Sequence, residues 1–528
     1  MSIRAAVPIL ALAAFRLSAQ SVLTYHNDNL RTGYYNSESQ LTWSNVNSKS
    51  FGLLFRYPVD GFVYAQPLYS SGLSIGGATH NVVIVATENN SVYVFDADQN
   101  GGTNAGVLWH TNFNTGPAGV TVTPVPSADV NCADLVPMIG ITSTPVIDPA
   151  TLTIYVVAKT KEVSASGTSY FHRLHALDLT TGKEKFGGPV AIQGSVPGSC
   201  GITDGNGNVV FHPLIQHQRP ALLLANGTIY IGFGSHCDLQ AYNGWLMAYN
   251  ASTLQQTAIL NASPDAPNGD CRGAVWQSGG GPSADPQGNI YTITGNGGFN
   301  ANRGGRSYGD SLLKLAPGGA SITDYFTPFY QKILDDKDYD FGSGAPLLLP
   351  DQPGRYPHLA VAAGKISEIY LLNRDSLGQY HPDSDRIVQD VPFPFGKSVE
   401  APYPPPVYAN QSVYFAAPVD PVRGFALANG MLSPKPYASG NTQFGTRGAG
   451  LSISSDSQGN NAIVWALNSS DPAALYAYKA TDLTQLYNSN QAGNRDVSGP
   501  GIKFSVPTIA GGKVFVGTAN SLAVFGNF

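Results

Sequence analysis

The stretch TPVIDPATLTIYVVAKTKEVSASGTSYFHRLHALDLTTGK, residues 144–183, contains the unit from which the rest of the chain is built. A short apolar segment follows its first proline. A second run of β-branched and aromatic residues, TIYVVAK, comes next, and a third, RLHALDLTTG, ends the stretch. Residues of these types favour strands, and the Asp-Pro and Thr-Gly steps favour turns. The stretch therefore predicts three consecutive strands of a small antiparallel sheet.

The proline-led strand recurs along the whole chain. It is marked by Pro67, Pro145, Pro220, Pro282, Pro346, Pro406, Leu451 (in the place of the proline) and Pro507. After each of these positions a second and a third strand-like run follow. A single sheet of this size cannot bury both of its faces, and radial packing of eight such sheets solves the problem. We therefore predict an all-β fold, a single eight-bladed β-propeller of four-stranded antiparallel blades.

The two ends of the chain are expected to meet. The last unit, KVFVGT with SLAVF, lacks an outer strand, and FGLLFRYPV (residues 51–59) has no blade of its own. We predict that this N-terminal strand closes the last blade, so that residues 51–528 form the propeller. Residues 20–50 then form an N-terminal arm, whose polar segment HNDNLRTGYYN (residues 26–36) we expect to lie over one face of the ring. Two smaller β-domains in tandem are the alternative architecture.

Composition and the N-terminus indicate an exported protein. Residues 1–19 combine Arg4, an apolar stretch and the small residues Ser18 and Ala19, which is typical of a cleavable signal peptide. No segment reaches the 18 apolar residues of a membrane span. Charged residues make up only 12%, the net charge is −6 and no basic run occurs, so nucleic acid is not expected as a partner. We expect a periplasmic or secreted protein; the sequence does not indicate an oligomeric state.

The four cysteines are candidates for disulfides in an exported protein. Cys132, Cys200, Cys237 and Cys271 all fall in loops on one face of the predicted ring, and they allow three pairings. We favour Cys200 with Cys271 and Cys132 with Cys237. No C-x-x-C-H occurs, so a covalently attached c-type haem is not encoded.

One face of the ring is expected to collect polar side chains. The loops that lead into the innermost strands and the loops that join strands two and three share this face. They contribute Gln66, Glu88, Thr142, Lys161, Glu162, His217, Arg219, His236, Asp238, Gln277, Asn296, Asp340, Lys365, Glu400, Arg447 and Lys503. Loops are polar in any protein, so solvated loop residues are the alternative interpretation. Because concave polar funnels are where propellers bind ligands, we favour a ligand site in the central funnel.

The repeats resemble those of the quinoprotein (PQQ-type) propeller family. TIYVVAKTK with RLHALDLTTGK, and KVFVGT near the C-terminus, match the family's repeat over nearly the whole mature chain. Non-enzymatic scaffold proteins use the same blades, so the repeat by itself does not imply catalysis.

Three segments extend the resemblance to the alcohol dehydrogenases of this family. TITGNGGFN, with the later Gly309-Asp310, is similar to a segment whose asparagine binds calcium beside the quinone, which places Asn296 in that role. DYDFGSGAPLLL (residues 338–349) resembles the segment of the catalytic base, and Asp340 aligns with it. Lys365 occupies the place of the quinone-binding arginine, where a cation can stabilise a reduced quinone.

The remaining positions match less closely. Trp276 is an approximate counterpart of the tryptophan beneath the quinone, and Asp238 is the nearest carboxylate for a calcium site with Asn296 and Asp340. Calcium requires six to eight oxygen ligands, of which these residues supply only part. The family's adjacent cysteine pair is missing. The other expected cofactor-binding residues are Gln66, Arg219, Gln277 and Arg447.

The resemblance implies an exported quinoprotein-like oxidoreductase that acts on an alcohol or sugar bound in the funnel. PQQ would be the cofactor, Asp340 the general base, and electrons would leave to a separate acceptor. The alternative is a non-catalytic binding or scaffold propeller that has lost the cofactor, which the missing cysteine pair favours. A carbohydrate-active hydrolase or lyase is a third hypothesis, for which the sequence contains no motif. Ordinary structural roles are also open: a turn for Asn296, a cap for Asp340 and interblade packing for Trp276.

Overall fold

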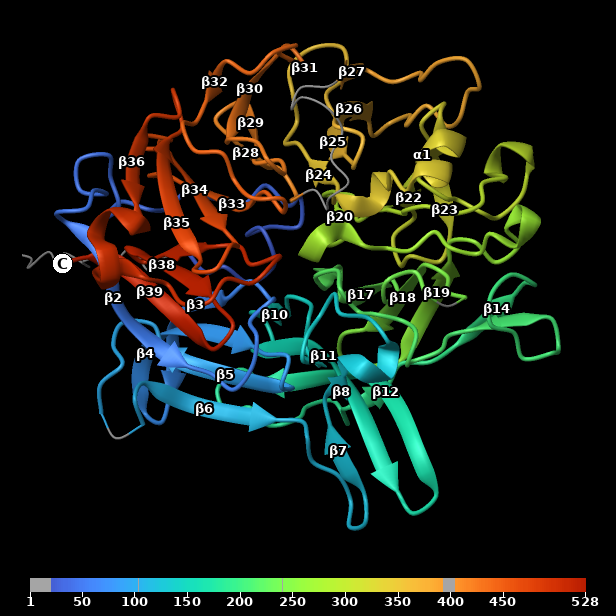
Figure 1. Cartoon of the computed structure of the whole chain (residues 1–528), viewed down its shortest axis with the longest axis horizontal. Helices are drawn as coiled ribbons and strands as arrows, with labels where there is room; N and C mark the ends of the chain where they lie inside the picture. Colours follow the sequence, from blue (N-terminus) through green and yellow to red (C-terminus); the bar gives the residue numbers. More distant parts are fainter. Residues whose placement is uncertain (1–19, 103, 240, 393–403) are drawn as a thin grey trace, which may run out of the picture.

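The protein is an eight-bladed β-propeller. The computed structural model describes residues 20–102, 104–239, 241–392 and 404–528. Eight antiparallel sheets surround one axis, and the proline-led strand of each sheet lies nearest that axis (Figure 1). The predicted fold is confirmed. The expected signal peptide, residues 1–19, lies outside the described residues.

The first four blades follow one another in chain order, and each runs outward from its innermost strand. Blade one consists of β3 (Leu68–Ile75), β4 (Ala78–Ala86), β5 (Ser91–Asp96) and β6 (Val107–Asn112). Blade two consists of β10 (Val146–Asp148), β11 (Thr153–Ser164), β12 (Gly167–Asp178) and β13 (Val190–Ala191). Blade three consists of β16 (Leu223–Ala225), β17 (Thr228–Phe233), β18 (Trp245–Asn250) and β19 (Gln256–Asn261). Blade four consists of β20 (Ser283–Ala284), β21 (Ile290–Ile293), β22 (Leu312–Leu315) and β23 (Ile322–Phe326).

The other four blades repeat this order with three variations. Blade five consists of β24 (Leu347–Leu348), β25 (Leu359–Ala363), β26 (Glu368–Asn373) and β27 (Gln389–Pro392). Blade six consists of β28 (Val407–Ala409), β29 (Ser412–Phe415), β30 (Arg423–Ala428) and a divided outer edge, β31 (Met431–Leu432) and β32 (Ala438–Ser439). Blade seven consists of β33 (Ala449–Ser454), β34 (Ile463–Asn468), β35 (Ala474–Lys479) and β36 (Gln485–Asn488), with β1 (Tyr34–Tyr35) added in parallel to β33. Blade eight consists of β37 (Thr508–Ala510), β38 (Lys513–Gly517), β39 (Ser521–Asn527) and β2 (Phe51–Pro58).

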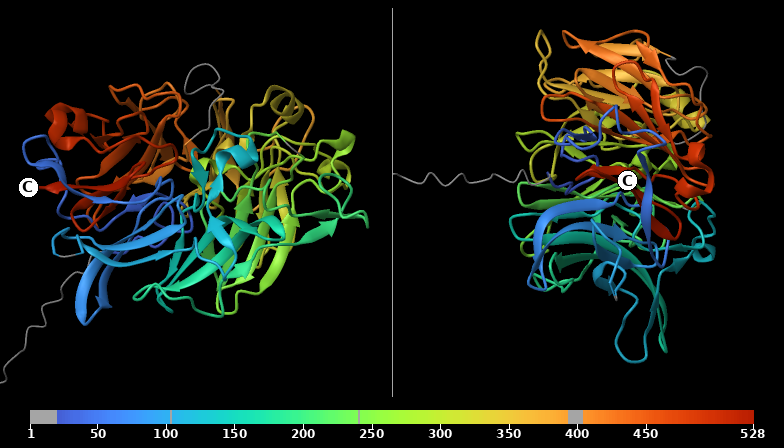
Figure 2. Two further views of the ribbon diagram at one scale, coloured as in Figure 1. Left: turned by 60° about the horizontal axis from the view of Figure 1, so that its bottom comes forward. Right: turned by 90° about the vertical axis from the view of Figure 1, so that its left-hand side faces the viewer.

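Small elements decorate the ring. The β11–β12 hairpin, joined by β7 (Thr121–Thr123), projects from it (Figures 1 and 2). The others are β8 (Val125–Pro126), β9 (Met138–Ile139), β14 (Ser195–Pro197), β15 (Asn208–Val210), α1 (Gln331–Lys337) and 3-10 turns at Ser127–Val130, Pro267–Gly269, Gln277–Gly279, Ala301–Arg303, Phe341–Ser343 and Ser489–Asp496. Within the described ranges, no helix has both the length and the apolar character needed to cross a membrane.

The hydrophobic core lies between the blades. Each principal apolar cluster takes buried residues from adjacent blades: Leu222 and Ile231 of blade three, for example, pack with Tyr155 and Val157 of blade two. The largest cluster joins blades seven, eight and one. Alternate residues of each strand therefore find an apolar surface on both sides, as the repeat analysis requires.

The predicted closure of the ring is also confirmed. Strand β2 pairs antiparallel with β39 along its whole length, from Phe51 opposite Asn527 to Pro58 opposite Ser521. The Phe51 side chain is fully buried and contacts the rings of Trp465 and Tyr487 in blade seven. The N-terminal and C-terminal parts of the chain are therefore held in one sheet.

The N-terminal arm departs from the expectation. It does not lie over a face but runs inside the ring, through the middle of Figure 1, where it circles the inner edges of the blades in their own order. Its contacts to blades one to eight are Val22 with Tyr69, Leu23 with Ile147, Asn29 with Leu224 and with Ala284, Leu30 with Leu348, Thr32 with Tyr408, Gly33 with Ile453, and Glu38 with Gly512. The hydrogen bonds in these contacts are 2.8–3.0 Å long.

The unpaired main-chain groups of the inner strands explain this position. The innermost strand of a blade is an edge strand, whose free N–H and C=O groups face the axis and need partners. The arm supplies most of these partners with its own main chain. The Arg31 guanidinium adds hydrogen bonds to the carbonyl oxygens of Leu222 (3.0 Å) and Pro282 (2.9 Å). The arm therefore occupies the channel between the inner edges of the blades.

Candidate functional site

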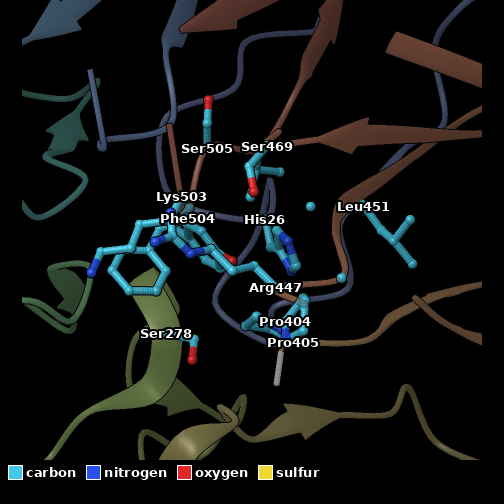
Figure 3. A pocket seen from close by; sticks show the side chains of 14 residues that line it. His26, Ser278, Pro404, Pro405, Arg447, Leu451, Ser469, Lys503, Phe504 and Ser505 are labelled. Atoms are coloured by element: carbon cyan, nitrogen blue, oxygen red, sulfur yellow. The ribbon is translucent and has the colours of Figure 1, made fainter. Parts of the chain in front are cut away.

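Two adjoining cavities lie on the predicted face of the ring. The larger one, which we call the funnel cavity, has a volume of about 200 Å³ and is lined by Asp134, Arg219, Cys237, Asp238, Trp276, Ser278, Asp340, Ser343 and Lys365. The smaller one, the side cavity, has a volume of about 30 Å³, and its lining includes Tyr25, His26, Ser278, Arg447, Lys503 and Phe504 (Figure 3). Ser278 belongs to both cavities. Tyr25 and His26 come from the arm, so the channel filling also forms a wall of the side cavity.

Asp340 and Lys365 line the funnel cavity, and Asn296 contacts Asp340 beside it. Asp340 precedes β24, Lys365 follows β25 and Asn296 follows β21. The Lys365 Nζ atom lies 2.7 Å from Asp340 Oδ2, and Asp340 Oδ1 accepts a hydrogen bond of 2.9 Å from the main-chain N–H of Asn296. The Asn296 side chain donates to Asp338 Oδ1 at 2.7 Å. The three residues are neighbours, as expected, but of the three only Asp340 and Lys365 line the funnel cavity.

Local sequence explains how these groups come so close. A Cβ atom at Gly295 would lie 2.3 Å from Asp340 Oδ1 and 2.8 Å from Trp276 Cδ1, so only glycine fits between them. The loop that follows is held by Asp310, which is fully buried and accepts the Phe341 N–H at 3.0 Å. Asp340 makes no capping hydrogen bond to the 3-10 turn that follows it. Its carboxylate is therefore directed to Lys365 and the funnel cavity.

The ion pair determines the charge of this cluster. Burial acts to lower the pKa of Lys365, but Asp340 and Asp338 outweigh burial and leave that pKa above its ordinary value. The pKa of Asp238 is raised, first by burial and then by the nearby Asp340 and Asp338. Lys365 therefore remains an ammonium group over the ordinary range of pH and is a fixed positive charge in the funnel cavity.

Trp276 and Arg219 form an aromatic and cationic wall. The Arg219 guanidinium lies 4.1 Å from the ring centre of Phe504 and 5.7 Å from that of Trp276. Trp276 also packs edge to face against Tyr242, so it has the expected packing role and lines the funnel cavity as well. A planar ligand would find an indole and a guanidinium on this side.

Asp134 lies opposite this wall, on the loop between β8 and β9. Its carboxylate forms a close ion pair with Lys503 and lies 3.8 Å from Arg219 Nη1. Burial acts to raise the pKa of Asp134, but Arg219, Lys503 and Arg447 outweigh burial and hold that pKa below its ordinary value. Burial lowers the pKa of Lys503 to about 8, against the raising effect of Asp134.

Several expected residues lie elsewhere. Gln66 is buried and holds the arm: its Oε1 accepts the His26 N–H at 2.9 Å, and its Nε2 donates to Thr508. Gln277 is fully buried and donates to Thr292 at 3.2 Å. Lys161 and Glu162 belong to the projecting β11–β12 hairpin, because β11 continues past the expected loop. Gln66 and Gln277 line neither cavity, Arg447 lines the side cavity only, and Glu400 lies outside the described residues.

The histidines of blade three belong to a buried polar chain. The rings of His217 and His236 stack at 4.7 Å, His217 Nε2 lies 3.2 Å from Thr142 Oγ1, and Lys159 Nζ lies 2.8 Å from His236 Nε2. Thr142 in turn donates to Glu88 at 2.7 Å, and burial raises the pKa of Glu88 to about 7. Burial also holds the pKa of both histidines well below its ordinary value, so both are neutral.

The two favoured disulfides are confirmed. Cys132 pairs with Cys237 (Cα–Cα 5.7 Å) and Cys200 with Cys271 (Cα–Cα 5.2 Å). The first bridge fastens the loop of Asp134 to the loop of Asp238, and Cys237 lines the funnel cavity. The sequence did not identify Asp134, Ser278, Ser343 or Tyr25 as site residues. It indicated His26 only as part of the polar arm segment, and Lys503 only as one of many polar loop residues. The position of Asp134 two residues after Cys132 was the available signal.

Comparison with known proteins supports the fold. No family model matches the chain, and no curated protein matches it in sequence. The quinohemoprotein alcohol dehydrogenase from Comamonas testosteroni superposes with a TM-score of 0.60 at 15% identity, over 96% of this chain and 80% of that one. The chain shares the fold of the quinoprotein dehydrogenases.

Two further structures agree. The quinohemoprotein alcohol dehydrogenase ADHIIG from Pseudomonas putida HK5 has a TM-score of 0.60 at 13% identity, covering 96% of this chain and 80% of that one. A europium-containing methanol dehydrogenase has a TM-score of 0.59 at 13% identity, covering 96% and 98%. At such identities the match establishes the quinoprotein fold of the ring, and the chemistry must be argued from the cavity.

The resemblance implies two bound groups, PQQ and calcium, and the lining of the cavity suits PQQ better than calcium. PQQ is a planar quinone with three carboxylates, and the indole of Trp276 and the cations Arg219 and Lys365 are groups that can bind such a molecule, while the carboxylates of Asp134, Asp238 and Asp340 line the same cavity. Calcium is not matched. Both oxygens of Asp340 are engaged, one by the Lys365 ammonium, and Asp238 accepts a hydrogen bond from Tyr242. Among the described residues, no group of three or more Asp, Glu, His or Cys is arranged to hold a metal ion.

Proposed function

We propose that the protein is an exported quinoprotein-like oxidoreductase that binds PQQ in the funnel cavity and oxidises an alcohol or a sugar. The observation that carries the proposal is the Asp340–Lys365 pair beside Trp276, in the funnel of a ring with the quinoprotein fold. The two disulfides agree with an oxidising compartment, the periplasm or the exterior.

The roles of the residues follow from their positions. Trp276 supports the plane of the cofactor, while Arg219 and Lys365 bind its anionic groups. When bound, PQQ supplies a quinone that takes up hydride from the carbon of the substrate. Asp340, which lies beside the Lys365 ammonium group, accepts the proton of the substrate hydroxyl. Lys365 also provides a positive charge for the negative charge that develops during the reaction.

The proposed reaction uses no calcium and needs an electron acceptor that is a separate molecule. We assign no step to calcium, because the donor set does not fit it. The electrons leave to a separate acceptor, since the sequence encodes no C-x-x-C-H haem site.

A binding propeller without the cofactor is the second candidate. The same Asp340–Lys365 contact favours it, because one oxygen of this carboxylate is already held by an ammonium group at 2.7 Å and the other accepts the Asn296 N–H. The missing calcium donors point in the same direction. This protein would hold a small alcohol or carbohydrate in the funnel without converting it.

Titration with PQQ separates the two candidates. The quinone absorbance should change with saturation at micromolar PQQ, and the loaded protein should oxidise ethanol or glucose with an artificial dye. Asp340→Asn should keep PQQ binding and lower turnover by about 10²–10⁴-fold. Asp338→Asn is the matched control, because Asp338 also contacts Lys365 but its side chain is 68% exposed, and its turnover should change little. If PQQ does not bind, the cofactor proposal fails and the binding propeller is supported.

A further inference from the structure

The Arg219 guanidinium is buried but has no hydrogen-bond partner. Its side chain is 8% exposed, its Nε atom is inaccessible, and among the described residues no atom accepts a hydrogen bond from any of its nitrogens. The rings of Phe504 and Trp276 hold its position, and it lines the funnel cavity. Buried guanidinium groups are normally satisfied by a carboxylate or phosphate in a two-pronged contact. The vacant donors of Arg219 therefore indicate an anionic ligand.

The surrounding charges agree with an anion site. The cations Arg219, Lys503 and Arg447 all act on the carboxylate of Asp134, and Arg219 is also affected by the nearby Asp340 and Asp238. Tyr25, which is 1% exposed, lines the adjacent side cavity, and its buried hydroxyl has no hydrogen-bond partner among the described residues. An anion between the two cavities would reduce the repulsion among the cations and satisfy the donors of Arg219.

Asp134 differs from its partners in exposure. Its side chain is 42% exposed, whereas those of Arg219 and Lys503 are 8% and 6% exposed. Its loop is fastened at Cys132 by the disulfide to Cys237, so the carboxylate can turn toward solvent while the backbone stays in place. The two buried cations are held in place, whereas the more exposed Asp134 carboxylate has room to move away from them.

We propose that Asp134 is a built-in counter-ion, which occupies the position of a ligand carboxylate on Arg219 and Lys503 and is displaced when an anionic ligand binds. The proposal rests on the proposed function only in taking the funnel as the ligand site. The chemistry is that of a carboxylate, which a sugar acid or PQQ can both supply. The ligand must break the ion pairs of Asp134 before it forms its own. The free energy of these internal ion pairs is therefore lost from the free energy of ligand binding.

Calorimetric titration at pH 6.5, where Lys503 is protonated, tests the proposal with gluconate, glucose and PQQ as probes. Asp134→Asn should bind gluconate or PQQ about fivefold more tightly than the wild type, since a partly exposed ion pair contributes about 1 kcal/mol. Glucose, which has no carboxylate, should bind equally to both. Asp129→Asn is the matched control: Asp129 pairs with Lys161 at 2.6 Å, just before the same loop but outside the funnel, and its removal should change neither affinity. Arg219→Gln should abolish the gain.

The outcomes separate this inference from the cofactor proposal. If Asp134→Asn binds gluconate more tightly than the wild type does and neither protein binds PQQ, the counter-ion proposal is supported and the proposed quinoprotein function is refuted. Tighter PQQ binding alone identifies the cofactor as the source of the carboxylate. If Asp134→Asn binds both anions no more tightly than the wild type, or if neither protein binds them, the counter-ion proposal is overturned, whatever the activity with PQQ. Far-UV circular dichroism and the unfolding midpoint check that Asp134→Asn is folded.

Discussion

Replacing Arg31 by methionine tests the role of the arm inside the channel. The Arg31 side chain is 1% exposed, and it donates four hydrogen bonds: to Thr24 Oγ1 (2.7 Å), Tyr25 O (2.9 Å), Pro282 O (2.9 Å) and Leu222 O (3.0 Å). Methionine fills a similar space but leaves these acceptors without a donor. The change therefore separates the hydrogen bonds from the packing.

The magnitude follows from the two opposing effects. Each buried acceptor that loses its partner costs about 1–3 kcal/mol, whereas removal of the guanidinium relieves the cost of burying a charge. Removal of one partner from a buried charged network costs about 3–5 kcal/mol in total, and we expect Arg31→Met to destabilise the fold by that amount. Arg306→Met is the control, because Arg306 is 53% exposed and pairs with Asp265 at the surface. It should cost less than about 1 kcal/mol.

Guanidinium unfolding followed by tryptophan fluorescence measures both variants. Limited proteolysis should show in addition that residues 20–38 become accessible in Arg31→Met while the blades remain resistant. If Arg31→Met unfolds at the same denaturant concentration as Arg306→Met, the arm does not stabilise the ring through this guanidinium, and our account of the channel is wrong.

Two further predictions concern burial and cross-linking. The raised pKa of Glu88 means that the folded state holds this proton more tightly than the unfolded chain, so the stabilisation is fully present below the unfolded pKa of 4.5 and is lost as the pH rises through about 7. Glu88→Gln should remove this dependence, because an amide does not titrate, and the amide can still donate a hydrogen bond to Thr142. Between pH 5 and 8 the wild type should lose up to about 3 kcal/mol of unfolding free energy relative to the variant in urea unfolding. Parallel pH profiles of the two proteins would contradict this prediction. Removal of the 71-residue link by Cys200→Ala with Cys271→Ala should cost about 4 kcal/mol by loop closure. A change in the unfolding midpoint no larger than that of a surface substitution would show that this bridge adds no stability.

The site could be predicted only where neighbouring residues identified it. Asn296, Asp340 and Lys365 each follow or precede a recognisable strand on consecutive blades, so a map of the blades placed them on one face, and the resemblance of their segments to the quinoprotein dehydrogenases selected them from the other polar loop residues. Gln66 and Gln277 occupy equivalent loop positions, yet their side chains turn into the protein to hold the arm and Thr292. A loop position defines a face of the ring, but the direction of a side chain depends on which buried groups lack partners.

The sequence by itself determined the number of blades, the closure by β2 and the face on which the cysteines and polar loops gather, because strand-forming repeats and turns are local properties of the chain. Only the tertiary structure decided the course of the arm and the arrangement of Arg219, Lys503 and Asp134 from which we infer an anion site. HNDNLRTGYYN shows no strand pattern, since the arm binds the blades mostly through its main chain, which every residue shares. Asp134 and Lys503 are 369 residues apart, and they meet because closure of the ring brings the loop that leads into blade two close to the loop that leads into blade eight. Such a contact arises from ring closure and leaves no trace in the local sequence around either residue.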